Sequence, residues 1–223
     1  MLNRIAAGRT DLIVEWADKG EDPTAKVDGV SLIGWCAYYG DVSAIRYLCE
    51  RGVRLEDLGS DLGLNGAAFH GHWRLCEFLI EQGANPRSAN AENGETPLHA
   101  ALCSEKSIEH ERVVEVLLAA GADPNAATIP GMETGSFMRD VRTRGESPLH
   151  RAAANGTLDS IRLLIGAGAE RAARDVNGDS PLTWASLALR ETSVMQALCF
   201  PPFAINSDRE SMRSYLVGGP KKE

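Results

Sequence analysis

The sequence GESPLHRAAANG occupies residues 145–156, and related stretches lie on both sides of it. GETPLHAAL spans residues 94–102, and GDSPLTWASLA spans residues 178–188. Ser147 and Ser180 hold the same place in two of these stretches and are 33 residues apart. A Ser or Thr directly before Pro is typical of a helix start, because the hydroxyl caps a free backbone N–H and proline in the first turn removes no hydrogen bond. The three stretches predict a repeated unit that begins with a helix.

A second helix is predicted further along each unit. In four units an apolar residue stands fourteen residues after the position that Ser or Thr holds in the motif, at Ile45, Cys76, Ile161 and Val194. Apolar residues follow three and four positions later, which places them on one face of a helix. The segments before the last one end in a Gly–Ala pair or a looser copy, as at Gly83–Ala84, whereas the last one runs into Phe200–Pro201–Pro202. Glycine is typical of a helix end where the chain leaves with positive φ.

Two weaker copies of the first stretch lie upstream. GVSLIGWCAYYG at residues 29–40 keeps a Ser and the final glycine, and LGLNGAAFHG at residues 62–71 keeps a Leu, the Ala–Ala pair and the glycine. Together these segments resemble the ankyrin-repeat family, whose G-x-[ST]-P-L-H-x-A signature they carry. The resemblance implies an all-α solenoid of about six stacked helix-turn-helix units, because one such unit cannot bury its own apolar face.

The register of the motif predicts where the units lie. We expect one ankyrin-repeat domain over residues 1–200, with atypical first and last units acting as caps and an insertion at 126–141. The units are expected near residues 2–26, 27–57, 58–90, 91–125, 142–174 and 175–200. Residues 201–223 are expected to form a capping segment, with a short helix at 207–217, followed by a disordered tail.

Composition narrows the class of protein. The chain has 223 residues and a net charge of −8, which disfavours general nucleic-acid binding because phosphate contacts need a basic surface. It has no apolar run long enough to span a membrane, and charged residues near the N-terminus argue against a signal peptide. Five irregularly spaced cysteines do not form a disulfide pattern. We expect a cytoplasmic, monomeric protein without cofactor or metal.

Several groupings that could carry chemistry have structural explanations instead. His70, His72 and Cys76 lie close together in sequence, but Cys76 holds a core position of its helix, so a metal site is not predicted. His99 and His150 belong to the repeated motif, where the imidazole bridges neighbouring units. The sequence contains no phosphate-binding glycine loop, paired catalytic carboxylates or nucleophile elbow. We therefore predict that the protein is not an enzyme.

The first candidate surface for a partner is aromatic. The resemblance implies that the two positions before the glycine between the helices belong to the concave face of the solenoid. These positions hold Tyr38 and Tyr39 in unit two, and Phe69 and His70 in unit three. Aromatic side chains on an exposed face are typical of binding hot spots. The alternative is that one residue of each pair packs between neighbouring first helices.

The second candidate is the insertion. The spacing from Thr96 to Ser147 is 51 residues rather than 33, and most of the excess follows Asn125. Loops of this length are usually functional or disordered. This one contains apolar and cationic side chains that a partner could contact, and the candidate residues are Phe137, Met138, Arg139, Arg142 and Arg144. We expect an elongated finger that folds back on the solenoid or meets a partner; the alternative is a flexible insertion without a role.

The run ETGSFMRDVRTRGESPLHRAA, which covers residues 133–153, also resembles one in a group of bacterial ankyrin-repeat proteins that have no assigned activity. It brings no mechanism. The function predicted from the sequence is a protein–protein interaction module that binds a specific cytosolic partner, as an inhibitor or regulator, through the concave face and the arginine-containing finger. The alternatives are a nucleic-acid or acidic-ligand site on the finger, and a small-ligand or metal-dependent enzyme in the concave groove.

Overall fold

The computed structural model describes residues 1–103, 108–134 and 142–201. Within them the chain forms six successive helix pairs, as the motif predicts. The first helices are α1 (Leu2–Ala6), α3 (Leu32–Tyr39), α5 (Leu64–Phe69), α7 (Pro97–Ala101), α9 (Pro148–Asn155) and α11 (Pro181–Leu187). The second helices are α2 (Leu12–Asp18), α4 (Val42–Glu50), α6 (Trp73–Glu81), α8 (Ile108–Ala119), α10 (Leu158–Gly166) and α12 (Thr192–Leu198).

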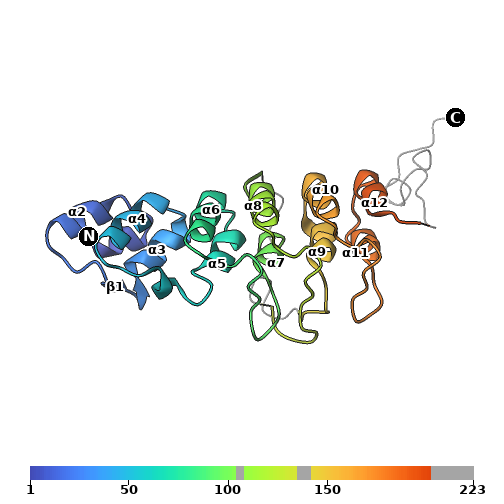
Figure 1. The fold of residues 1–223 in the computed structure, drawn as a ribbon, viewed down its shortest axis with the longest axis horizontal. Helices are drawn as coiled ribbons and strands as arrows, with labels where there is room; N and C mark the ends of the chain where they lie inside the picture. Colours follow the sequence, from blue (N-terminus) through green and yellow to red (C-terminus); the bar gives the residue numbers. More distant parts are fainter. Residues whose placement is uncertain (104–107, 135–141, 202–223) are drawn as a thin grey trace, which may run out of the picture.

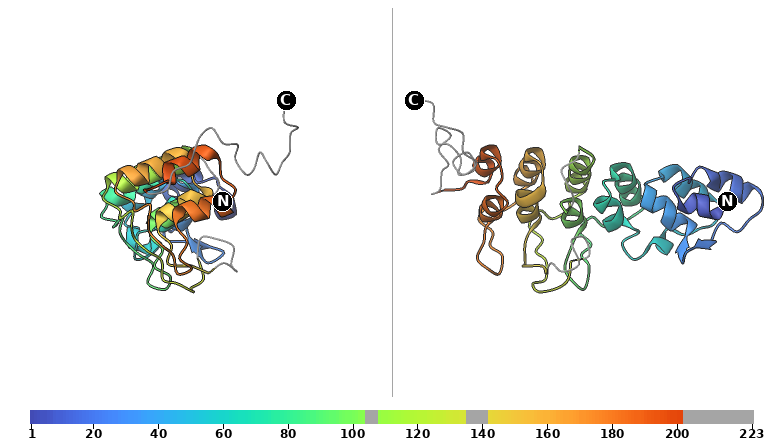
Figure 2. Two further views of the ribbon diagram at one scale, coloured as in Figure 1. Left: turned by 90° about the vertical axis from the view of Figure 1, so that its right-hand side faces the viewer. Right: turned by 180° about the vertical axis from the view of Figure 1, so that it is seen from behind.

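The helix pairs stack side by side into an elongated solenoid (Figure 1). First helices pack against first helices, as in the contacts of α5 with α7 and of α9 with α11, and second helices form a parallel layer in which α6, α8, α10 and α12 follow one another. The connections between units project as fingers from the side of the first helices (Figures 1 and 2). The all-α repeat architecture predicted from the sequence is confirmed.

The core is continuous from unit to unit. Leu64, Leu98 and Leu149, which hold equivalent places in three first helices, are fully buried. The apolar residues predicted to open the second-helix stripe are buried as well, including Ile45 and Ile161. Because each unit buries its apolar face against the next, stability is distributed over neighbouring contacts.

The motif histidines bridge units, as predicted. In α9, the backbone N–H of Ser147 donates to Nδ1 of His150 at 3.1 Å, so the proton resides on Nε2. That nitrogen donates to the Asp179 carbonyl of the next unit at 3.1 Å. His99 repeats the arrangement and donates from Nε2 to the Glu146 carbonyl at 3.1 Å. Both imidazoles are buried.

The glycines that follow the second helices have the predicted backbone. Gly83, Gly121 and Gly168 have φ values of 100°, 87° and 95°. A side chain disfavours this left-handed region, so glycine allows the chain to turn sharply from each second helix into the next finger.

Regular strand is confined to one finger in the described part of the chain. Strands β1 (Lys26–Val27) and β2 (Val30–Ser31) pair antiparallel between α2 and α3. A short 3-10 helix, η1 (Leu55–Leu58), occupies the next finger. No larger sheet is present among the described residues, which agrees with the predicted helical class.

The fourth unit departs from its neighbours. Its second helix, α8, has 12 residues, whereas α6 and α10 have nine. Its additional first turn follows residues 104–107, which lie outside the described residues, as do 135–141 and 202–223. The expected C-terminal capping segment and disordered tail therefore fall almost entirely outside the described structure, and the unit boundaries stay a prediction.

Candidate partner-binding surface

A groove lies between the fingers and first helices of units two and three. It has a volume of about 710 Å³ and is lined by the β1–β2 hairpin, by η1 with the turn after it, and by one face of α3 and α5. The lining is mixed in character. Val30 and Leu58 contribute apolar surface, while Lys26 and Asp57 contribute charge.

The groove is open because its floor is made of small residues. Ala37 and Ala67 line it, together with Gly63 and Gly66 of unit three. Gly66 lies within helix α5, and a Cβ atom added there would have no neighbouring atom within 4 Å. The space above Gly66 could therefore receive a side chain of a partner.

The predicted aromatic residues meet at one end of this groove. The ring centroids of Tyr38 and His70, from units two and three, are 4.8 Å apart in an edge-on contact. The ring centroids of Phe69 and His70 are 5.1 Å apart, and the Phe69 side chain is partly buried against the core. Tyr38 is 51% exposed, and His70 is also exposed. We call Tyr38, Tyr39, Phe69 and His70 the aromatic cluster.

Tyr39 has a second role. Its hydroxyl donates to the Ala6 carbonyl at 2.9 Å, and its ring contacts Gly8, where a Cβ atom would lie 3.3 Å from Cε1. Tyr39 therefore ties unit two to unit one, as the packing alternative foresaw for one residue of each pair. Tyr39 is nevertheless 39% exposed, and its ring centroid lies 5.0 Å from that of Tyr38.

Two histidines fix the backbone beneath the cluster. Nε2 of His72 donates to the Tyr38 carbonyl at 2.9 Å, and Nε2 of His110 donates to the Phe69 carbonyl at 3.0 Å. His110 belongs to the additional first turn of α8. Burial lowers the pKa of His70, and the charges of His72 and His110 lower it further. The cluster therefore presents a neutral imidazole at neutral pH.

The described residues on either side of 135–141 form the two adjacent arms of one finger, the first at 128–134 and the second at 142–146. The N–H of Gly131 donates to the Thr143 carbonyl at 2.7 Å, and the N–H of Thr143 donates to the Met132 carbonyl at 2.8 Å. An isolated antiparallel bridge joins Glu133 and Arg142. The arms fold back on unit four, where the N–H of Ile129 donates to the Asn93 carbonyl at 2.8 Å.

The base of this finger is tied to a buried ion network that the sequence did not reveal. The Arg151 guanidinium lies 2.7 Å from both the Glu95 and the Glu146 carboxylates, and all three side chains are almost completely buried. Thr134 donates to Glu95 at 2.5 Å, and Thr128 donates to Glu146 at 2.7 Å. The network joins units four and five to the insertion.

Neighbouring charges and hydrogen bonds favour the ionised forms of Glu146 and Arg151 in this network. Burial alone would raise the pKa of Glu146, but the Arg151 charge and several hydrogen bonds hold it below its usual value. Burial opposes the charge of Arg151, but Cys103 and the two carboxylates raise its pKa. The same environment acts in the opposite sense on His99, whose pKa falls to about 4 because of burial and the Arg151 charge.

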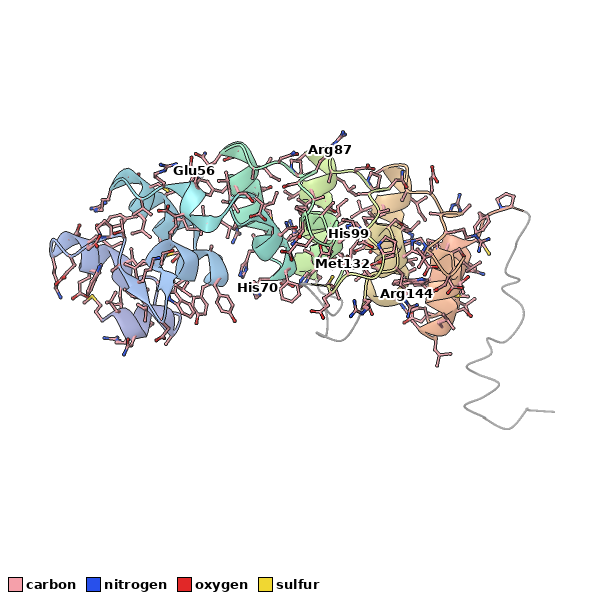
Figure 3. All side chains as sticks on the ribbon, turned by 90° about the horizontal axis from the view of Figure 1, so that it is seen from below. Glu56, His70, Arg87, His99, Met132 and Arg144 are labelled. Carbon is pink, nitrogen blue, oxygen red and sulfur yellow. The ribbon has the colours of Figure 1, made fainter. Side chains whose placement is uncertain are left out.

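The remaining predicted residues divide into two groups. Phe137, Met138 and Arg139 lie outside the described residues. Arg142 and Arg144 are exposed on the second arm of the finger. In the view from below, Arg144 and His70 lie along the same edge of the molecule, and Glu56 and Arg87 lie along the opposite edge (Figure 3). The aromatic cluster and the arginines thus share one side of the solenoid but not one site.

Metal-binding and membrane-spanning features are absent from the described residues. Within the parts of the chain that the structure covers, no group of three or more His, Cys, Asp or Glu side chains is placed to hold a metal ion. Over the same residues, no helix has the length and apolar character needed to cross a membrane. All five cysteines lie among the described residues, and none of them forms a disulfide bond.

Comparisons with known proteins agree with the repeat architecture. The family model described as ankyrin repeats (3 copies) matches residues 36–128 and 132–209. The chain is 31% identical over 151 residues to the target of rapamycin complex 2 subunit AVO2 of Saccharomyces cerevisiae, which covers 64% of this chain and 31% of that protein. It is 32% identical over 185 residues to human ankyrin repeat and SOCS box protein 3, covering 71% of this chain and 34% of that protein.

A shorter relative is the cyclin-dependent kinase 4 inhibitor B of Rattus norvegicus. It is 32% identical over 124 residues, which cover 56% of this chain and 81% of the inhibitor. The chain therefore spans most of this relative, but only about a third of the length of the two preceding ones.

Proposed function

The chain belongs to the ankyrin-repeat family, a family of protein–protein interaction modules, and we propose that its partner binds in the groove between units two and three. The observation that carries the proposal is the juxtaposition of an open, small-residue floor with an exposed aromatic cluster. Aromatic anchors beside a hollow that can receive side chains are typical of the energetic centre of an interface.

Binding in this groove is proposed to regulate the partner without catalysis. One relative is named as an inhibitor of a kinase, and it aligns with this chain over 81% of its own length. An inhibitor or regulator can act by occupying a surface, which needs no catalytic group. Five cysteines without a disulfide bond fit the cytoplasmic location predicted from the sequence.

The proposal is tested by filling the groove. Gly66→Trp places an indole above the floor of the groove, where a Cβ atom meets nothing within 4 Å. The backbone at this position is helical, so the substitution should not strain it. Affinity capture from the native host should recover the partner with the wild-type chain, and recovery should fall about tenfold or more with Gly66→Trp.

Gly166→Trp is the matched control. Gly166 is also a helical glycine at which an added Cβ atom would meet nothing within 4 Å, but it ends α10 in the second-helix layer. The control should capture the same partner as the wild type. Equal recovery by all three proteins, each with an unchanged melting temperature, would place the partner elsewhere.

A further inference from the structure

Three exposed arginines lie on two adjacent fingers, those that lead into units five and six. Arg142 and Arg144 lie on the second arm of the insertion, and Arg174 lies at the start of the following finger. The two fingers are joined directly, because the N–H of Val176 donates to the Arg144 carbonyl at 2.9 Å. We call the surface formed by these arginines with Ile129, Met132 and Val176 the arginine surface.

Each arginine is held in place by a different contact. Nη1 of Arg142 donates to the Gly131 carbonyl at 2.7 Å, and Nη1 of Arg174 donates to the Gly178 carbonyl at 2.9 Å. The Arg144 guanidinium lies over the Trp184 ring, 5.7 Å from its centroid. A guanidinium that is already positioned loses less conformational entropy when it binds a carboxylate.

Three carboxylates lie near the arginines. Glu146 is paired with Arg151, Asp175 accepts from the Trp184 indole N–H at 3.0 Å, and Glu133 stands opposite Arg142 in the antiparallel bridge. Among the described residues, no ion pair joins Arg142, Arg144 or Arg174 to a carboxylate. The three guanidinium groups therefore remain available, within the described structure, to pair with carboxylates of a ligand.

Exposed apolar side chains lie on the same two fingers. Ile129 and Met132 on the first arm of the insertion are 44% and 39% exposed, and Val176 on the next finger is 61% exposed. The N–H of Ile129 is used in the contact with unit four, so this side chain is presented by a fixed backbone. A ligand that matches the surface needs apolar groups as well as negative charge.

We propose that the arginine surface binds an extended acidic segment of a protein partner, in which Asp or Glu residues alternate with aliphatic ones. Carboxylates accept two parallel hydrogen bonds from a guanidinium, and aliphatic side chains would cover Ile129, Met132 and Val176. A phosphate backbone supplies no such aliphatic groups, and the net charge of −8 opposes nucleic acid. This inference rests on the proposed protein-binding function, and it adds a second contact beyond the groove.

The test uses a short fluorescein-labelled peptide of alternating Glu and Leu, titrated with the full chain and followed by fluorescence anisotropy. The variant Arg142→Gln/Arg144→Gln/Arg174→Gln should bind about tenfold more weakly or worse than the wild type. The matched control is Arg46→Gln/Arg54→Gln/Arg162→Gln, which removes the same charge from exposed arginines elsewhere. Its affinity should change less than about twofold.

Three outcomes would overturn the proposal. The first is an equal loss of affinity in both triple variants, which would reduce the effect to net charge. The second is equal binding of a peptide in which Ser replaces Leu, which would remove the apolar contribution. The third is tighter binding of oligothymidine than of the Glu–Leu peptide, with steep salt dependence, which would identify a nucleic-acid site.

A local readout separates this proposal from the groove. The Trp184 indole N–H resonance should shift when the Glu–Leu peptide binds, because Trp184 contacts Arg144. The Trp35 indole, in unit two, should not shift. Gly66→Trp should leave peptide binding unchanged, so failure of the groove proposal and failure of the arginine surface give different results.

Discussion

The space between neighbouring first helices is left open at the junction of units two and three and is filled at the junction of units four and five. At the first, glycine and alanine leave a groove of about 710 Å³ beside exposed aromatic rings. At the second, Arg151 fills the corresponding space and is bound by two buried carboxylates. One junction is open to a partner, and the other is closed by a charged network.

The difference arises at single positions of the repeat. Arg151 follows the motif histidine of unit five, and the equivalent position of unit three is Gly66. The family scaffold tolerates either residue because the leucine core beneath is unchanged, with Leu64 and Leu149 both fully buried. If the partner binds in the groove as proposed, different units of one solenoid provide the buried ion network and the binding surface.

The largest effect is expected from breaking the closed junction. Arg151→Met should lower the free energy of unfolding by about 3–5 kcal/mol, because it removes the Arg151 charge from the buried Glu95 and Glu146 carboxylates. Urea unfolding followed by circular dichroism measures this. The triple variant Arg151→Met/Glu95→Gln/Glu146→Gln should recover much of the loss. A loss below about 1 kcal/mol, similar to that of an exposed pair such as Arg162–Asp159, would show that the network contributes little.

The attachment of the insertion should have the next largest effect. Thr134→Val removes the hydroxyl that donates to Glu95 and should cost about 1.5–3 kcal/mol, the range for hydrogen bonds to charged groups. Thr24→Val, in the first finger, removes an exposed hydroxyl that donates to Asp22 and should cost less than about 0.5 kcal/mol. Equal, small losses of unfolding free energy in the two variants would show that the attachment of the finger does not stabilise the folded core.

Acid should weaken the closed junction. The pKa of His99 is about 4 in the folded chain against 6.5 for a free imidazole, so the unfolded chain binds the proton first as the pH falls. Stability present above pH 6.5 is therefore lost between pH 6.5 and 4. At pH 5 the loss should reach about 2 kcal/mol relative to pH 7.5.

Unfolding free energies of the wild type and of His99→Gln, measured across this pH range, isolate the effect. The variant should be less stable at pH 7.5 and should lose less stability on acidification. Parallel pH profiles for the two proteins would assign the acid sensitivity to other groups.

The smallest effect concerns the open junction. Gly66→Ala should stabilise the chain by about 0.5–1 kcal/mol, because it restricts the unfolded chain and its Cβ atom meets nothing. Gly34→Ala, on the same groove, should destabilise it, since its Cβ atom would lie 2.9 Å from Cγ1 of Val30. Thermal melting of both variants checks the opposite signs, and a destabilised Gly66→Ala would mean that the groove is less open than the structure indicates.

The sequence predicted the fold well because the fold is periodic. The capping residues, the motif histidines and the glycine exits recur at fixed spacing, and each has a local physical role that the structure confirms at Ser180, His150 and Gly121. The register also predicted that Tyr38 and His70 belong to the same face, since both lie within two positions of the glycine between the helices, but it did not predict their ring contact. Whether the aromatic cluster binds a partner stays a prediction.

The features that the sequence did not reveal are not periodic. Arg151 meets Glu95, 56 residues earlier in the chain, and the two threonines that complete the network belong to the insertion. The available signal in the sequence was that Glu95 and Glu146 both directly precede the Ser or Thr of the motif. This signal indicates a buried ion network only when Arg151 is considered with it. The arginine surface likewise depends on Arg174, whose finger contacts the insertion finger through the Val176 N–H and the Arg144 carbonyl rather than through the repeat.

The most direct test of the central claim is site-specific photo-cross-linking. p-Benzoylphenylalanine is placed at Tyr38, in the aromatic cluster beside the open junction, and separately at Arg74, an exposed position on α6 in the second-helix layer. The account predicts that the protein captured by the wild-type chain forms an adduct from position 38 and none from position 74. An adduct from position 74, with none from position 38, would contradict the assignment of binding to the groove.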